Sequence, residues 1–235
     1  MRLREKFEKI FPILAEKFPD PKSELNFTNT FQLLVAVMLS AQATDQSVNR
    51  ATAKLFKTVS TPEELLELGE SELYDSIKSI GLAKTKARNI ISTSQLLVGK
   101  YNSSVPDNFN DLISLPGVGS KTARVVLNVG FQQPTIAVDT HIFRVSQRLK
   151  LSKGKTPDQI SEDLVKLVPP QYMMKAHHYL LLHGRYTCRA QNPQCSICEL
   201  AEFCSFHKKG IHEKKTGKRH RKNEALPDSI KTPKE

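Results

Sequence analysis

The sequence predicts an all-α fold. Helix-start signals recur along the chain, apolar residues repeat at helical spacing, and no segment alternates convincingly with the period of two that marks a strand. Two of the starts combine a threonine cap, a proline at the first helical position and a Glu or Gln that completes a capping box. They are TPEE at residues 61–64 and TPDQ at residues 156–159.

The same periodicity places the other elements. A first helix carries Phe7, Ile10, Phe11 and Leu14 on one face. Proline-containing segments predict breaks between elements at residues 19–21 and 169–170. Further helices are expected near residues 30–40, 44–57, 71–79, 84–99, 107–114, 120–130, 140–149 and 171–183.

Length and composition bound the class of protein. The chain has 235 residues, enough for one large core or two modest ones, and 39% hydrophobic with 25% charged residues is typical of a soluble globular protein. The longest apolar stretch, residues 31–40, is too short to span a membrane. The N-terminus lacks the apolar core of an export signal, so we expect a cytoplasmic protein with no membrane partner.

Positive charge is concentrated at the C-terminal end. The formal net charge is +11, and residues 208–235 hold ten Lys or Arg against four Asp or Glu. Because this segment has almost no large apolar residues, it is predicted to be a basic disordered tail. A basic protein favours polyanions, since neutralised phosphates release counterions, although a merely basic solvated surface also explains the charge.

All four cysteines lie within seventeen residues, as Cys188, Cys195, Cys198 and Cys204. This C-x6-C-x2-C-x5-C pattern predicts that the thiols converge on one object. Disulfides are disfavoured because the chain has no export signal and the cytosol is reducing. Zinc ribbons usually pair two C-x2-C knuckles and only one is present, so the spacing favours a [4Fe–4S] cluster while zinc stays open. His207 is close enough in sequence to replace one ligand.

The segment LPGVGSKTA at residues 115–123 predicts a turn between two helices, within a helix-hairpin-helix at about residues 109–128. Pro116 ends the first helix, and Gly117 and Gly119 permit positive φ and close backbone approach. Backbone N–H groups around Val118, at the start of the second helix, can hold a DNA phosphate without reading sequence. A simple corner between helices is the alternative, because Gly-x-Gly alone is a weak signal.

Lys121 and Asp139 are the candidates for chemistry. Lys121 falls in the first turn of a helix, where the positive end of the helix dipole favours a neutral amine, the form that attacks carbon. Taken alone, a plain phosphate-binding lysine is the simpler interpretation. Asp139, in VDTHIFRV at residues 138–145, has the position of a helix N-cap. It either only caps, or its carboxylate faces Lys121 and stabilises positive charge developing on a sugar.

Together these motifs resemble the endonuclease III family of base-excision glycosylases and AP lyases. The matching segments are LPGVGSKTA, IAVDTHIFRV, HGRYTC and the cysteine pattern, with SELNF, LSAQATD and IGL upstream, and they run from about residue 5 to 207. The resemblance implies two helical domains flanking a DNA-binding groove. One is a six-helix domain at 22–133. The other is an iron–sulfur domain that combines the N-terminal helix at 1–21 with 134–207 and holds one [4Fe–4S] cluster.

The resemblance also implies a reaction. The enzyme flips a damaged pyrimidine out of the duplex, which costs ~a few kcal/mol of stacking and pairing. Lys121 attacks C1′ of the deoxyribose, displaces the base and forms a Schiff base, and β-elimination then cuts the strand 3′ to the lesion. Asp139 supports the developing positive charge. The implied partner is double-stranded DNA with oxidised or ring-saturated pyrimidines or abasic sites. The enzyme is expected to be a monomer, nucleoid-associated if bacterial.

Further DNA contacts follow from the resemblance. Gln42 and Leu82 would fill and wedge the vacated stack, with a core position as the alternative for Leu82. Gly117, Val118 and Gly119 would hold the DNA backbone. The residues expected near the flipped nucleotide are Ser40, Thr44, Asp45 and His141.

Two features depart from the family pattern, and two rival functions stay open. The loop after Cys188 has only Arg189 as a basic residue, which predicts a weaker DNA contact there, and the tail after residue 207 is longer than usual. An adenine-mismatch glycosylase shares the hairpin, the aspartate and the cluster, but usually lacks a lysine at the position of Lys121. A non-catalytic DNA-binding module of the same fold would need neither Lys121 nor Asp139.

Overall fold

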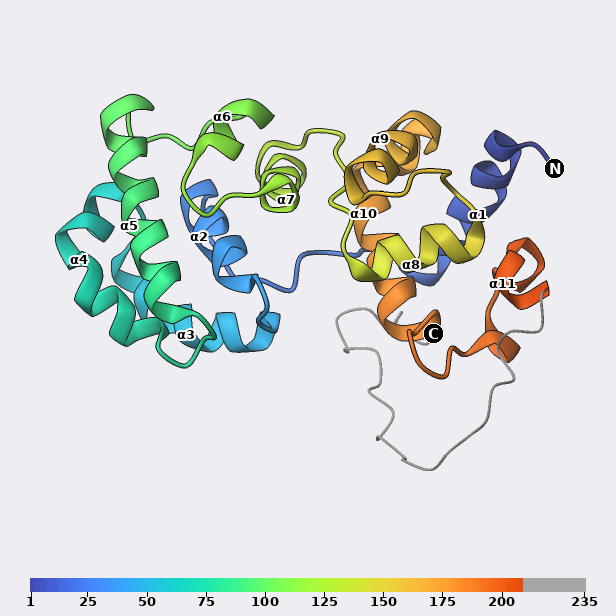
Figure 1. Ribbon diagram of the computed structural model, residues 1–235, viewed down its shortest axis with the longest axis horizontal. Coiled ribbons are helices and arrows are strands. Elements are labelled where there is room, and N and C mark those ends of the chain that lie inside the picture. The colour runs from blue at the N-terminus through green and yellow to red at the C-terminus, as the bar shows by residue number, and fades with distance from the viewer. Residues whose placement is uncertain (209–235) are drawn as a thin grey trace. The chain divides into compact units, whose positions relative to one another are not determined.

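The computed structural model describes residues 1–208, which are helical and contain no strand, as predicted (Figure 1). The chain forms two compact units. One is Ser23–Pro134, and the other joins Met1–Lys22 to the chain from Thr135 onward. The predicted basic tail lies outside the described residues, apart from Lys208. In the described part, no helix is both long and apolar enough to cross a membrane.

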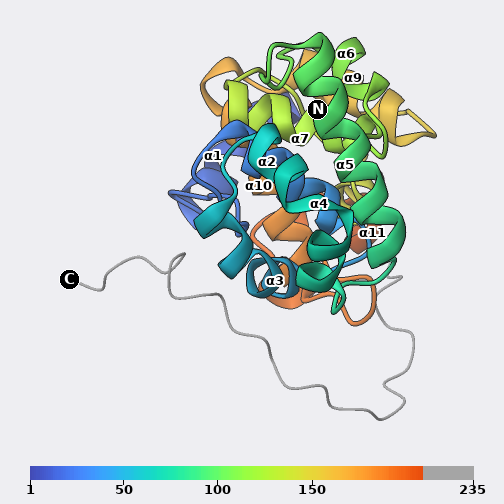
Figure 2. The ribbon, with the colours of Figure 1, turned by 90° about the vertical axis from the view of Figure 1, so that its left-hand side faces the viewer.

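The unit Ser23–Pro134 is built around an apolar central helix, α2, whose residues from Phe31 to Leu39 are all buried. Packing of α7 against α2 is close, since a Cβ on Gly130 would lie 3.0 Å from Cδ2 of Leu33. The helices α4 and α5 lie side by side in both views (Figures 1 and 2). The six helices are α2 (Thr30–Ser40), α3 (Asp45–Thr58), α4 (Pro62–Ile77), α5 (Ala83–Lys100), α6 (Phe109–Ser114) and α7 (Ser120–Phe131).

The capping box at the start of α4 is confirmed, and the helix predicted near residues 71–79 is the second part of α4. Thr61 Oγ1 accepts a hydrogen bond from the Glu64 N–H at 3.2 Å, and Glu64 Oε2 accepts one from the Thr61 N–H at 3.1 Å. Gly69, with φ 82°, divides α4 into two helical segments that meet at a kink. The second segment therefore begins soon after Gly69 and ends at Ile77.

The other unit packs the N-terminal helix α1 (Leu3–Lys17) against α10 (Met173–Leu182). The predicted apolar face of α1 is fully buried, and the ring centroids of Phe7 and Phe11 are 5.8 Å apart. These residues share one hydrophobic cluster with α8 (Thr140–Leu149) and α9 (Pro157–Leu167). The cysteine segment follows α10 and ends at α11 (Ser205–Lys208).

A π-helical turn, His183–Thr187, extends α10 and was not expected from the sequence. It packs closely against α8, because a Cβ on Gly184 would lie 2.8 Å from the His141 Cβ and 3.1 Å from its carbonyl oxygen. Single π-helical turns within helices occur frequently at functional sites. Here the turn brings Cys188, its next residue, to α8.

Candidate active site

The turn between α6 and α7 presents helix N–H groups that have no capping side chain. Gly117 adopts φ 77°, and Gly119, the N-cap of α7, supplies no side-chain hydrogen bond. The Val118 side chain is buried, and its N–H donates to the Leu115 carbonyl at 3.1 Å. The Val118 side chain thus packs inside the turn. The N–H groups in the first turn of α7 are the donors suited to an anion.

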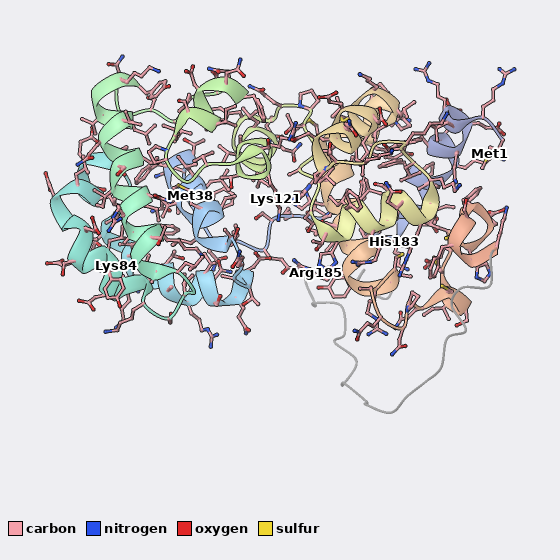
Figure 3. All side chains as sticks on the ribbon, in the orientation of Figure 1. Met1, Met38, Lys84, Lys121, His183 and Arg185 are labelled. Carbon is pink, nitrogen blue, oxygen red and sulfur yellow. The ribbon has the colours of Figure 1, made fainter. Side chains whose placement is uncertain are left out.

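Lys121 is the second residue of α7 and its side chain is exposed (Figure 3). It is two residues beyond Gly119, at the positive end of the helix. Lys84 has the equivalent place in α5, as an exposed second residue, and is labelled in the same figure. The two lysines therefore differ in what precedes the helix, and only Lys121 follows the glycine turn.

Two further turns of the same unit carry exposed residues in left-handed backbone. Gln42, between α2 and α3, is exposed with φ 58°. Leu82, the N-cap of α5, has φ 61° and is 63% exposed, so it is not a core residue. A bulky residue with positive φ is strained, and such strain persists only where the surrounding structure fixes it.

The other predicted residues between α2 and α3 also have local roles. Ser40 Oγ donates to the Val37 carbonyl at 2.8 Å, and Thr44 caps α3 by accepting from the Ser47 N–H at 3.2 Å. Asp45 is the first residue of α3. Ser40 and Thr44 therefore help to build the turn that displays Gln42.

In the other unit, Asp139 is confirmed as an N-cap. Its Oδ1 accepts a hydrogen bond from the Ile142 N–H at 2.8 Å at the start of α8, and the residue is only half-buried. His141, two residues on, has Nδ1 3.2 Å from Nη2 of Arg144. The cap fixes the backbone and the orientation of the carboxylate.

The four cysteines line a single cavity of about 350 Å³, including space open to solvent. Its wall is otherwise largely apolar, with Leu149 and Phe206 among the lining residues. In residues 1–208, no three His, Cys, Asp or Glu side chains are grouped closely enough to hold one metal ion. Thiols spread around a cavity suit a multi-iron cluster better than a zinc ion, which draws its ligands to ~2.3 Å.

Burial shapes the chemistry of these thiols. It raises the pKa of Cys198 to about 11 and also raises the pKa of Cys195, so both are protonated at neutral pH without metal. Iron supplies the positive charge that stabilises buried thiolates. The donor set therefore fits a cluster that forms with loss of the thiol protons.

Two arginines one turn apart on α8 hold the cysteine segment, and the sequence reasoning missed them. Arg144 Nε donates to the Cys188 carbonyl at 2.8 Å and Arg148 Nη1 donates to the Arg189 carbonyl at 2.7 Å. Arg148 Nη1 also lies 3.4 Å from Cys188 Sγ. Their i, i+4 spacing was visible, but their partners are some forty residues away in sequence.

Comparison with known proteins identifies the family. Residues 35–170 match the model of the HhH-GPD superfamily base excision DNA repair proteins, and residues 188–204 match the iron–sulfur binding domain of endonuclease III. Endonuclease III of Rickettsia felis is 52% identical over 206 residues, covering 88% of this chain and 97% of the relative. That of Escherichia coli K12 is 51% identical over 196 residues, covering 83% and 93%.

Solved structures agree with these relatives. A non-covalent endonuclease III–DNA complex superposes with a TM-score of 0.84 at 41% identity, covering 91% of this chain and 100% of that one. A trapped endonuclease III–DNA covalent intermediate gives 0.83 at 42% identity, with 90% and 100% covered.

These matches define the class as a helix-hairpin-helix base excision repair protein. More narrowly, the chain belongs to the endonuclease III family. Its activity is that of a bifunctional DNA glycosylase and AP lyase, and its cofactor is one [4Fe–4S] cluster.

Cys198→Ser is expected to release the cluster and destabilise the unit that holds it. Loss of a structural metal centre removes binding free energy that is also folding free energy, here ~3 kcal/mol or more, which lowers the melting temperature by ~10 °C or more. Iron content and visible absorption, followed by thermal unfolding, measure both effects. Ser196→Ala, at an exposed residue of the same segment, is the control and should retain iron. A Cys198→Ser protein with full iron content would contradict this ligand set.

Proposed function

We propose that this protein excises damaged pyrimidines from double-stranded DNA as a monomer, with Lys121 as its nucleophile. The observation that carries the proposal is the place of Lys121, an exposed amine directly behind a glycine turn whose uncapped amides suit a phosphate. The trapped covalent DNA intermediate of a relative at 42% identity supports an enzyme-bound step of this kind.

The proposed reaction begins with attack of Lys121 on the sugar and ends with release of the amine by water. The Lys121 amine forms a bond to C1′ as the bond from C1′ to the base nitrogen breaks, and the base leaves with the electron pair and a proton. Ring opening breaks the bond from C1′ to O4′, O4′ takes up a proton to become a hydroxyl, and a protonated imine is left between Lys121 and C1′. The imine withdraws electrons, so a base can remove a C2′ proton and the bond from C3′ to the phosphate oxygen breaks. Water then releases the amine.

The remaining sequence-based assignments belong to the same proposal. Asp139 stabilises positive charge on the sugar, and His141, Ser40, Thr44 and Asp45 line the damaged nucleotide. Gln42 and Leu82 fill the emptied stack, and the turn formed by Gly117, Val118 and Gly119 holds the DNA backbone. The two compact units act as the hairpin domain and the iron–sulfur domain, with Cys188, Cys195, Cys198 and Cys204 as ligands. Residues 208–235 add affinity for phosphates, and in a bacterial cell the enzyme associates with the nucleoid.

A panel of duplexes tests the proposal. The iron-loaded protein is incubated with duplexes that carry thymine glycol, an abasic site, adenine opposite 8-oxoguanine, or no lesion. We expect base release with strand cleavage on thymine glycol, cleavage at the abasic site, and neither on the other two. Adenine release without strand cleavage would indicate a mismatch glycosylase. Binding without turnover would indicate a non-catalytic module, and light scattering on a sizing column reports the oligomeric state.

A further inference from the structure

One face of α5 reaches both the turn that carries Gln42 and the glycine turn. Lys86, Asn89 and Thr93 recur at intervals of three and four residues, so their side chains leave the helix on the same side. The N-cap of this helix is Leu82, the exposed residue of the third turn. A single rigid helix thus adjoins all three turns to which the proposed function assigns DNA contacts.

Lys86 joins α5 to the end of α2. Its side chain is buried, and Nζ donates to the Leu39 carbonyl at 2.8 Å and to the Ala41 carbonyl at 2.7 Å. These carbonyls belong to the last turn and the C-cap of α2, which lack helical N–H partners and form the negative end of the helix dipole. Burial lowers the pKa of the Lys86 ammonium, and the two carbonyls with the dipole offset that cost.

The residue after Ala41 is Gln42, which has left-handed backbone. Because the Ala41 carbonyl is in the peptide group that leads into Gln42, the bond from Lys86 fixes the orientation of that peptide. The Lys86 N–H donates to the Leu82 carbonyl at 3.0 Å, which is the ordinary helical bond at the start of α5. The Lys86 side chain therefore ties the Gln42 turn to the first turn of the helix that begins at Leu82.

At the other end of the face, Asn89 and Thr93 hold the glycine turn. Thr93 Oγ1 donates to the Pro116 carbonyl at 2.9 Å. A Cβ on Gly117 would lie 2.7 Å from Nδ2 and 2.9 Å from Cβ of Asn89, so the turn lies directly on α5. Contacts with α5 thus position both the glycine turn and the Gln42 turn.

We propose that Lys86 is a positioning residue for base extrusion, which holds the Gln42 turn in register with Leu82 while the damaged nucleotide leaves the stack. This rests on the proposed function, in which Gln42 and Leu82 occupy the vacated space. Lys86 touches neither DNA nor the reacting atoms. Its effect is on the extrusion step, because Gln42 and Leu82 fill the stack only when the nucleotide has left it. A misplacement of about 1 Å can cost about 100-fold in rate.

Lys86→Met tests this role, because methionine retains the length of the stem and removes the donors. Single-turnover base release is measured on thymine glycol paired in a duplex and on the same lesion in an unpaired bubble, where extrusion costs least. We expect a deficit of about 10–100-fold on the paired lesion that shrinks to within about threefold in the bubble. The matched control is Leu97→Ala, which opens a cavity at a buried residue of α5 about three helical turns from Lys86, toward the other end of the helix from the Gln42 turn.

All variants are measured well below their melting temperatures. Leu97→Ala should show equal, small deficits on both substrates, since it lowers stability and leaves the Lys86 hydrogen bonds to the end of α2 in place. Equal deficits for Lys86→Met on the two substrates would overturn the positioning role. If Lys86→Met does not fold, Lys86→Arg is used instead, because it keeps the positive charge on a larger guanidinium group. Its deficits on the paired and the bubble substrate are compared in the same way. Absence of turnover by the wild-type protein on both substrates would instead contradict the proposed function.

Discussion

Lys121→Ala is expected to reduce strand cleavage at abasic sites by about 10⁴-fold or more, because the proposed enzyme-bound imine cannot form without the amine. Lys121 is exposed, so its removal should leave the free energy of unfolding within ~0.5 kcal/mol of the wild type. Affinity for an undamaged duplex should fall only slightly, since one cation is lost from a surface that is basic overall. Quench-flow cleavage assays and fluorescence anisotropy measure the two effects separately.

Lys84→Ala is the matched control for this prediction. Lys84 and Lys121 are both exposed and both occupy the second position of a helix, so each variant removes the same charge from the same helical position. A lysine that only binds phosphate would give matching, modest losses of affinity in the two variants. Similar cleavage rates for the two variants would therefore restore the simpler interpretation of Lys121.

Asp139→Asn is expected to slow base excision by about 10²–10³-fold while stability and DNA affinity are maintained. Asparagine caps helices as well as aspartate does, so the hydrogen bond from the Ile142 N–H can persist. The substitution removes the negative charge that we propose to stabilise the sugar. Single-turnover base release, measured beside thermal unfolding, checks the result.

Asp139→Ala separates capping from chemistry at the same position. It removes the cap as well as the charge, so α8 should lose ~1 kcal/mol in addition to the catalytic effect. If Asp139 only caps, Asp139→Asn retains full activity and Asp139→Ala loses stability alone. That pattern would remove Asp139 from the proposed mechanism.

The features that the sequence predicted well are local ones. The capping boxes at Thr61 and Thr156 and the cap at Asp139 each depend on residues within one turn of the chain, and all three are present. The face of α1 is set by periodicity alone, and its four apolar residues are fully buried. Such signals can be recognised because cause and effect lie within a few residues.

The features that the sequence did not predict depend on distant partners. Lys86 was not singled out, although it occupies a buried position of α5, because its acceptors on α2 are more than forty residues away. Arg144 and Arg148 were missed for the same reason. The sequence also did not show that packing buries the Val118 side chain, or that its N–H donates within the turn. The π-helical turn after α10 packs against α8 at Gly184, a contact between segments about forty residues apart in sequence.

Borohydride trapping followed by peptide mapping tests the central claim most directly. The iron-loaded protein is mixed with an abasic-site duplex, the imine is reduced, and the cross-linked peptide is identified by mass spectrometry. We predict one adduct per chain, carried by Lys121 and absent from Lys121→Ala. An adduct on another amine, or persistence of trapping in Lys121→Ala, would contradict the account.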